Sequence, residues 1–261
     1  MRSVLAILTF LTVTPILATV VIVAGLCGVR DRQGSVYDWA PRLWGRSLLR
    51  AAGVQVVLHN AERAPHGQPR IFVSNHVSWF DVFTLAAVLR RYKFVGKAEL
   101  FRIPLFGRAA HAAGMIAIER ENRKASFESY RIAAQHIRDG ASVVVCPEGT
   151  RGANYRLRPF KKGPFVLAAA AGVPIVPILL HGTLGVYPQD TWWRVRPGTI
   201  HVHFLEEIST EGTTYEDRSA LATLCWRRMA DALEREYGIL SERPRELGDP
   251  TNARPPFVKE A

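Results

Sequence analysis

An apolar stretch near the start of the chain limits what the protein can fold into. From Val4 to Val29 the sequence runs for 26 residues without a charged side chain and is rich in Val, Leu, Ile and Ala. A helix through all of them would be about 39 Å long, which exceeds the ~30 Å hydrocarbon core of a bilayer. We therefore expect this segment to form a helical membrane anchor that precedes a soluble domain.

Two other interpretations of the apolar stretch stay open. A secretory signal peptide also combines an early arginine, here Arg2, with an apolar core, although such cores are usually shorter. Pro15 and Gly25 could divide the stretch into a helical hairpin that enters the membrane and returns, so the number of crossings is not fixed. The three cysteines have neither disulfide nor metal spacing, which favours a reducing compartment over export.

Arginines distinguish the two sides of the apolar stretch. One arginine precedes it, and the next five follow it closely: Arg30, Arg32, Arg42, Arg46 and Arg50. By the positive-inside tendency, the remainder of the chain is then cytoplasmic. We expect localisation at the cell inner membrane, with the soluble domain on the cytoplasmic side.

Apolar residues at helical spacing alternate with several of these arginines between residues 36 and 58. The apolar positions are Trp39, Leu43, Trp44, Leu48 and Leu49. The pattern predicts a helix in the membrane interface, with its tryptophans at headgroup depth. An ordinary amphipathic helix packed on the domain is the alternative, and both can hold at once. We assign residues 1–58 to the anchor and this interfacial helix.

Strand-like and helix-like segments alternate behind the anchor. The strand-like runs are 54–58, 70–74, 93–95, 115–118, 142–146, 175–180 and 199–205, and the helical ones are 79–91, 125–138 and 163–171. Alternation of this kind predicts a single α/β domain over residues 59–240, with a mainly parallel central sheet covered by helices. A last helix is expected from Thr213, with Glu216 in its capping box, until Gly238. Residues 241–261, rich in proline and charge, predict a disordered tail.

A histidine and an aspartate lie on either side of a break after one strand-like run. Residues 72–81 read FVSNHVSWFD, so His76 falls in the predicted turn and Asp81 in the first turn of the next helix. Folding back could bring the carboxylate to the imidazole, hold the ring's tautomer and make His76 a general base. Ser78 and Asp81 also match a capping box, in which Asp81 serves only the helix N-terminus.

Charged residues follow the ends of other strand-like runs. Residues 145–152 read VCPEGTRG and carry Glu148 and Arg151 in a loop, while Lys97 and Arg120 follow two shorter runs. Arginine and free backbone amides at a strand edge suit a phosphate group. The formal net charge of +11 also favours an anionic partner, which could be nucleic acid, a phospholipid surface or a phosphorylated substrate.

Four ordered segments resemble the conserved blocks of the glycerolipid acyltransferase family. They read NHVSWFD (75–81), GMIAIER (114–120), PEGTR (147–151) and VPIVPI (173–178). The resemblance implies an enzyme that transfers a fatty acyl group from a thioester, acyl-CoA or acyl carrier protein, to the sn-2 hydroxyl of 1-acyl-glycerol-3-phosphate. The product would be phosphatidic acid, and the partners would be membrane lipids, lysophosphatidate and the acyl donor.

The resemblance also implies roles for individual residues. His76 would deprotonate the acceptor hydroxyl and Asp81 would orient His76, so no protein nucleophile is required. Substrate-binding residues would be Arg120 and the third block, which comprises Glu148, Gly149, Thr150 and Arg151. Lys97 is a further phosphate candidate, argued from its charge and spacing. Gly152 departs from the family, in which a hydroxyl residue often follows the arginine of the third block.

Other functions were weighed against this one. Lyso-ornithine-lipid acyltransferases share the histidine and aspartate, although their acceptor has no phosphate. A hydrolase would use water as the acceptor, and a non-enzymatic lipid-binding protein would explain the anchor and the charge alone. A nucleic-acid binder explains only the charge, and we expect no nucleic-acid partner. His201 and His203 share a strand face without an apparent third ligand, so we expect no metal and no organic cofactor.

Overall fold

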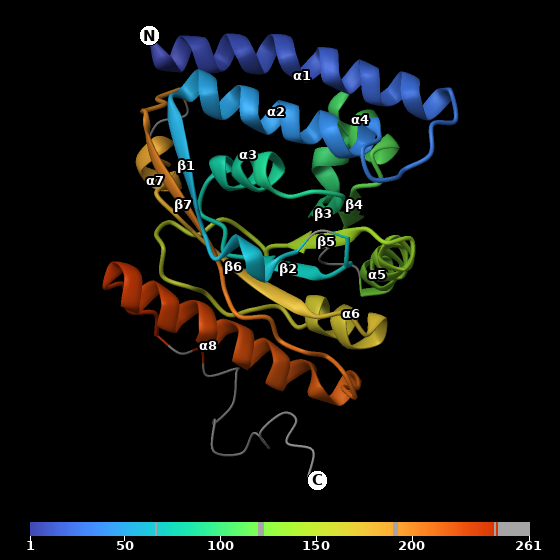
Figure 1. Cartoon of the computed structure of the whole chain (residues 1–261), viewed down its shortest axis with the longest axis vertical. Coiled ribbons are helices and arrows are strands. Elements are labelled where there is room, and N and C mark those ends of the chain that lie inside the picture. Colours follow the sequence, from blue (N-terminus) through green and yellow to red (C-terminus); the bar gives the residue numbers. More distant parts are fainter. Residues whose placement is uncertain (66, 120–122, 190–192, 243, 245–261) are drawn as a thin grey trace.

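The computed structural model describes residues 1–65, 67–119, 123–189, 193–242 and 244 (Figure 1). Within these residues, seven strands form one sheet in the order β1-β7-β6-β2-β5-β3-β4. Every pairing between these strands is parallel except that of β6 with β7, so the predicted mainly parallel sheet is confirmed. The strands are β1 (Val54–His59), β2 (Ile71–Ser74), β3 (Tyr92–Lys97), β4 (Ile116–Ile118), β5 (Ser142–Val145), β6 (Ile175–His181) and β7 (Gly198–Phe204).

Helices cover both faces of the sheet. One face carries α2 (Val36–Ala52) and α3 (Trp79–Val88), with α1 (Arg2–Leu26) outside them. The opposite face carries α5 (Arg123–Arg138), α6 (Gly163–Ala171) and α8 (Arg218–Tyr237), as Figure 1 shows. Two short helices, α4 (Phe106–Ala112) and α7 (Thr183–Val186), and 3-10 turns at Ala61–Arg63, Ala98–Arg102 and Tyr215–Asp217 complete the fold.

The central strands are buried on both faces, which explains their continuous apolar runs. Phe72 of β2 packs into the core beneath α2 and α3, whereas Ile71 and Val73 pack into the core beneath α6 and α8. Close contact between α2 and α3 depends on Gly45. A Cβ at Gly45 would lie 2.8 Å from the backbone nitrogen of Ala87, so a larger residue would force the two helices apart.

The apolar stretch at the start of the chain forms one continuous helix. α1 runs through Pro15 without a break, so the stretch is not a hairpin. It packs along α2 and against α4, with Leu17 and Val21 in a small core beside Tyr37 of α2. Its other side is apolar and exposed, and Leu11 is 61% exposed. Among the described residues, α1 is the one helix long and apolar enough to cross a membrane.

α2 divides its apolar residues between the domain and the surface. Leu48 and Leu49 are buried, and the indole N–H of Trp44 donates to Thr14 of α1 at 2.9 Å. Trp39 and Leu43 are exposed. α2 therefore packs on the domain and still presents apolar side chains outward. The sheet begins at Val54, inside the range that the sequence assigned to the anchor and interfacial helix.

The start of the last helix differs from the prediction by one residue. Thr214 and Asp217, rather than Thr213 and Glu216, form the capping box, and a 3-10 turn leads into α8. The Thr213 hydroxyl instead donates to the carbonyl of Thr210 at 2.7 Å. α8 ends at Gly238, as predicted. Most of the predicted tail, 243 and 245–261, lies outside the described residues.

Candidate active site

Asn75 fixes the turn that follows β2. Its side-chain amide donates to the carbonyl of Leu180 at 2.9 Å, and its Oδ1 accepts the backbone N–H of Leu180 at 2.8 Å. The side chain thus continues the pairing of β2 with β6 for one more step, after the β2 backbone has turned away. This contact joins residues 105 positions apart and sets the direction in which His76 leaves the sheet.

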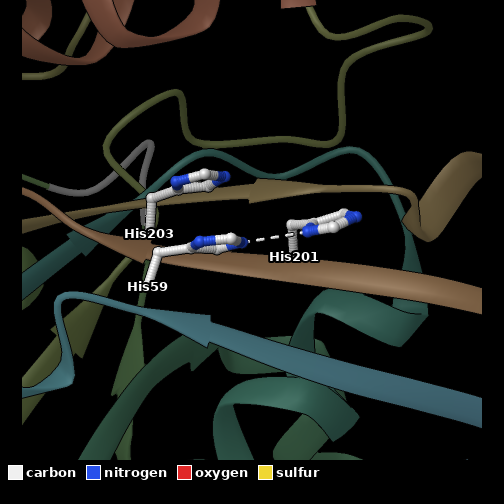
Figure 2. A group of neighbouring side chains, drawn as sticks. All are labelled: His59, His201 and His203. Carbon is white, nitrogen blue, oxygen red and sulfur yellow. Dashed lines mark hydrogen bonds between the residues drawn. The ribbon is translucent and has the colours of Figure 1, made fainter. Parts of the chain in front are cut away.

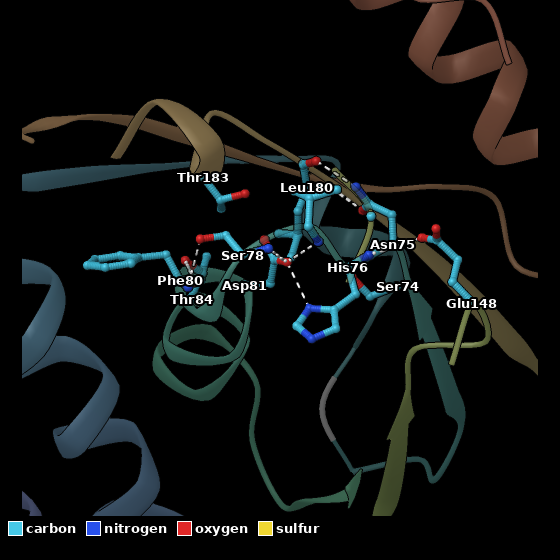
Figure 3. Close-up of polar contacts among 12 residues, drawn as sticks. Ser74, Asn75, His76, Ser78, Phe80, Asp81, Thr84, Glu148, Leu180 and Thr183 are labelled. Atoms are coloured by element: carbon cyan, nitrogen blue, oxygen red, sulfur yellow. Dashed lines mark hydrogen bonds and ion pairs between the residues drawn. The ribbon is translucent and has the colours of Figure 1, made fainter. Parts of the chain in front are cut away.

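His76 and Asp81 meet directly (Figure 3). Nδ1 of His76 lies 2.9 Å from Oδ2 of Asp81, and the same oxygen accepts the backbone N–H groups of Val77 and Ser78 at 2.7 Å each. The Asp81 side chain is fully buried, whereas the His76 side chain is 17% exposed. Asp81 therefore caps α3 and holds the imidazole with a single oxygen atom.

The contact fixes the protonation pattern of the imidazole. Because an ionised carboxylate only accepts hydrogen bonds, Nδ1 of His76 carries the proton and donates it to Asp81. Nε2 is then left as the basic nitrogen. Oδ1 of Asp81 is buried and has no hydrogen-bond partner among the described residues, so the contacts that balance the carboxylate charge all lie on Oδ2. Such a carboxylate stabilises the imidazolium that forms when Nε2 takes up a proton.

Glu148 holds the histidine loop from the other side. Its Oε1 accepts the backbone N–H of His76 at 3.1 Å, and its Oε2 lies 3.4 Å from both the backbone nitrogen and Nε of Arg158. Burial raises the pKa of the Glu148 carboxyl, and the hydrogen bonds from His76 and Arg158 act in the opposite direction. Both oxygens contact protein groups, so the carboxylate positions the loop. Its implied part in positioning substrate stays a prediction.

Three further hydrogen bonds link the first sequence block, Gly152, which directly follows the third block, and Gln189. The backbone N–H of Gly152 donates to the carbonyl of His76 at 2.8 Å. The side-chain amide of Gln189 donates to the carbonyls of Val77 and Gly152 at 2.8 and 2.5 Å. Gly149 turns the third block with φ +79°, a conformation that favours glycine. The loop after β5 is thereby fastened to the loop that carries His76.

Arg151 is exposed and lies at the start of α3. Its guanidinium carbon lies 4.9 Å from the ring centroid of Trp79, the first residue of α3, two positions before Asp81. Thr150 is exposed, and its carbonyl accepts a hydrogen bond from Arg158. Because stacking on the indole leaves the guanidinium edges accessible, Arg151 can still donate to an anionic group.

The other two predicted cations follow β3 and β4, the last two strands in the order of the sheet. Lys97 ends β3, which is separated from β2 by β5, and its ammonium forms an exposed ion pair with Glu99 at 2.9 Å. Arg120 follows β4, the outermost strand, and lies outside the described residues. Both follow strands that run parallel to β2, so these strands end at the same edge of the sheet.

Sequence reasoning missed three residues that shape this site, namely Asn75, Arg158 and Gln189. One signal in the sequence marks Asn75: it is an amide at the end of a predicted strand, directly before the candidate base His76. Nothing local marks Arg158 or Gln189: Arg158 contacts Glu148 across 10 positions of chain, and Gln189 contacts Val77 across 112.

Comparison with known proteins supplies the family. A family model described as Acyltransferase matches residues 55–181, which contain the His76–Asp81 pair and the whole PEGTR block. The human 1-acyl-sn-glycerol-3-phosphate acyltransferase beta is 32% identical over 205 residues, which is 78% of this chain and 72% of the human protein. The chain belongs to the acyltransferase family.

Other relatives in this acyltransferase family agree with the resemblance noted in the sequence, which is confirmed. A chloroplastic 1-acyl-sn-glycerol-3-phosphate acyltransferase of Brassica napus, BAT2, is 38% identical over 134 residues, covering 51% of this chain and 39% of that protein. The chain spans between 39% and 59% of the length of the relatives from Brassica napus, Chlamydomonas reinhardtii, Arabidopsis thaliana and Cocos nucifera.

A solved structure shares the fold of this acyltransferase family member. The 1-acyl-sn-glycerophosphate (LPA) acyltransferase PlsC of Thermotoga maritima superposes with a TM-score of 0.70 at 23% sequence identity. The superposition covers 93% of this chain and all of that one. The N-terminal helix and the α/β domain therefore form an arrangement already seen in a solved protein.

Proposed function

We propose that the protein transfers a fatty acyl group from an acyl thioester to the sn-2 hydroxyl of 1-acyl-glycerol-3-phosphate, which yields phosphatidic acid. The observation that carries the proposal is the 2.9 Å contact between Nδ1 of His76 and Oδ2 of Asp81, with Nε2 left as a base. The names of the curated relatives support the choice of acceptor.

The proposed reaction needs no nucleophile from the protein. Nε2 of His76 removes the proton of the acceptor hydroxyl while that oxygen attacks the thioester carbonyl carbon. Collapse of the tetrahedral intermediate breaks the carbon–sulfur bond, and the thiolate leaves. Since a thiol has a pKa of about 8.5, the leaving group needs little acid assistance and can take its proton from the imidazolium. The ester, the free thiol and neutral His76 are then the products.

Arg151 is the proposed ligand for the acceptor phosphate. It is exposed, lies over Trp79 at the start of α3 and has no acidic partner among the ion pairs of the described residues. Lys97 and Arg120 remain proposed phosphate contacts on neighbouring strands. Lys97 would have to exchange its exposed partner Glu99 for substrate, which costs little because exposed ion pairs are weak.

We propose coenzyme A or acyl carrier protein as the carrier of the donor, and neither a metal nor a prosthetic group in the transfer itself. An imidazole base paired with a carboxylate is sufficient for attack on a thioester. The net charge of +11 suits the anionic phosphates of either carrier as well as the acceptor headgroup.

Attachment at the cytoplasmic face of the inner membrane is proposed from α1 and α2. Because α1 packs lengthwise on α2 and α4, one side of it is held by the domain and the other is free to enter lipid. A helix held along the domain in this way would lie in the membrane plane rather than cross it. The exposed Trp39 and Leu43 of α2 would then reach the same interface.

An acceptor comparison tests the proposed function. Purified protein would receive oleoyl-coenzyme A with lysophosphatidate, with lyso-ornithine lipid or without acceptor, while free thiol and lipid product are followed. We expect product and stoichiometric thiol with lysophosphatidate, and neither in the His76→Ala variant. Product with lyso-ornithine lipid alone would assign a different acceptor, and thiol release without any acceptor would assign a hydrolase.

A further inference from the structure

Four histidines gather on the α8 face of the sheet, on strands other than β2, which leads to His76. His201 and His203 point to the same face of β7 because they are two residues apart. His59, the last residue of β1, is the register partner of His203, and His181, the last residue of β6, is the partner of His201. The pairing of three strands therefore places the four rings together.

Three of these rings lie close enough to share one ligand (Figure 2). Nε2 of His59 is 3.0 Å from Nδ1 of His201, and the rings of His59 and His203 stack with their centroids 4.1 Å apart. One ring nitrogen from each of the three lies within 4.8 Å of the others. Two nitrogens bound to one tetrahedral Zn²⁺ are separated by about 3.3 Å, so His59 and His201 already lie near this spacing, and His203 would have to rotate out of its stack on His59.

The rings have the protonation state that a metal requires. A 3.0 Å contact between two imidazole nitrogens needs one N–H and one bare nitrogen, so His59 and His201 are not both protonated there. Neutral imidazole is the form of histidine that binds metals.

Tyr237 holds the buried ring of His203 in place. Nε2 of His203 and the hydroxyl of Tyr237, the last residue of α8, share a 2.7 Å hydrogen bond. The ring of Tyr237 also stacks on that of His181, with centroids 3.6 Å apart. Hydrogen-bonded neighbours of this kind orient metal-binding histidines, and their loss usually lowers metal affinity.

We propose that His59, His201 and His203 bind a divalent transition metal of the zinc type. Three imidazoles without a carboxylate suit zinc, cobalt, nickel or copper rather than magnesium or calcium. The sequence alone predicts no metal here, because no third ligand is apparent in it. His59 supplies that ligand from 142 positions away. The metal would join the edge strand β1 to β7 and so fasten the strand that follows the α1–α2 pair.

Metal titration of the full chain tests the proposal. Protein purified in detergent without a histidine tag, and stripped with a chelator, would compete for Zn²⁺ with a chromophoric chelator. We expect one Zn²⁺ per chain, and visible absorption bands of tetrahedral Co²⁺ when cobalt replaces zinc. His59→Gln and His201→Gln should each weaken Zn²⁺ binding at least tenfold and abolish the cobalt bands.

Two matched variants separate this site from other histidines. His111→Gln changes an exposed histidine on α4, and His76→Ala removes the proposed base; both should bind Zn²⁺ as the unchanged protein does. Thermal unfolding without metal checks that every variant is folded. Added Zn²⁺ should raise the unfolding temperature of the unchanged protein and of the His111 and His76 variants, but not that of the His59 and His201 variants. The proposal is overturned if the unchanged protein does not bind Zn²⁺ at micromolar concentration. It is also overturned if folded His59→Gln and His201→Gln bind Zn²⁺ as tightly as the unchanged protein, or if only His76→Ala loses binding.

Discussion

Oδ2 of Asp81 accepts the Nδ1 proton of His76 at 2.9 Å while it also accepts the backbone N–H of Ser78 at 2.7 Å. The capping box of α3 and the proposed catalytic pair therefore share one atom. The helix cap places the carboxylate, and the carboxylate places the imidazole. Asp81 therefore both caps α3 and orients the proposed base His76. Substitutions can separate these two roles.

Asp81→Asn should lower kcat far more than it lowers stability. An amide can still accept from the backbone N–H groups of Val77 and Ser78, but it cannot stabilise an imidazolium or enforce the tautomer. Loss of the corresponding carboxylate in a serine-protease triad costs about 10⁴-fold in kcat, and we expect a fall of that order. Steady-state transfer rates and thermal unfolding measure the two effects.

Ser78→Ala is the matched control for the cap. Oγ of Ser78 accepts the backbone N–H of Phe80 at 3.3 Å but does not contact His76. We expect a stability loss of about 1 kcal/mol with kcat within a few-fold of the unchanged protein. If Ser78→Ala and Asp81→Asn reduced kcat equally, Asp81 would act through the cap alone.

Arg151→Ala should raise the Michaelis constant for lysophosphatidate by about tenfold and change kcat less, because a charge-assisted contact to phosphate would be lost. Kinetics at varied acceptor concentration measure the change. Lys97→Ala provides a comparison, since its ammonium already has Glu99 as a partner, and we expect a smaller rise. An unchanged constant in Arg151→Ala would remove this residue from the phosphate site.

Glu148→Gln should alter how stability depends on pH. Burial raises the folded-state pKa of Glu148 above its unfolded value, so folding favours the protonated form. Its contribution to stability is then fully present below the unfolded pKa, about 4.3, and is lost as pH rises through the folded-state pKa. Glutamine cannot ionise and lacks this dependence.

Denaturant unfolding of the two proteins across this pH range provides the measurement. Relative to Glu148→Gln, the unchanged protein should lose stability as pH rises. A stability difference that stays constant with pH would show that the carboxyl does not titrate with folding. Arg158→Gln, which removes the charged neighbour of Glu148, should move the folded-state pKa further upward and extend the window to higher pH.

Leu11→Lys should weaken membrane attachment without unfolding the domain. Leu11 lies on the free side of α1, and a lysine there would have to leave lipid or be desolvated. We expect at least about tenfold weaker binding to anionic vesicles in sedimentation assays. Leu240→Lys is the matched control, because Leu240 is similarly exposed and follows α8, which lies on the other face of the sheet from α1 (Figure 1). Equal loss in both variants would contradict attachment through α1.

Local patterns in the sequence determined the α/β class, the N-terminal apolar helix, most element positions and the His76–Asp81 pair. Hydrophobic periodicity and capping signals depend on neighbours within one or two turns, so they can be read without a fold. The one-residue error at Thr213 arose because adjacent hydroxyl residues can each cap, and the structure pairs Thr214 with Asp217.

Tertiary structure alone decided how α1 lies on α2, how Asn75 and Glu148 hold the histidine loop, and that His59 meets His201 and His203. Each depends on contacts between residues far apart in the chain, such as the 105 positions between Asn75 and Leu180. Strand order and register, which no short window of sequence encodes, bring these side chains together.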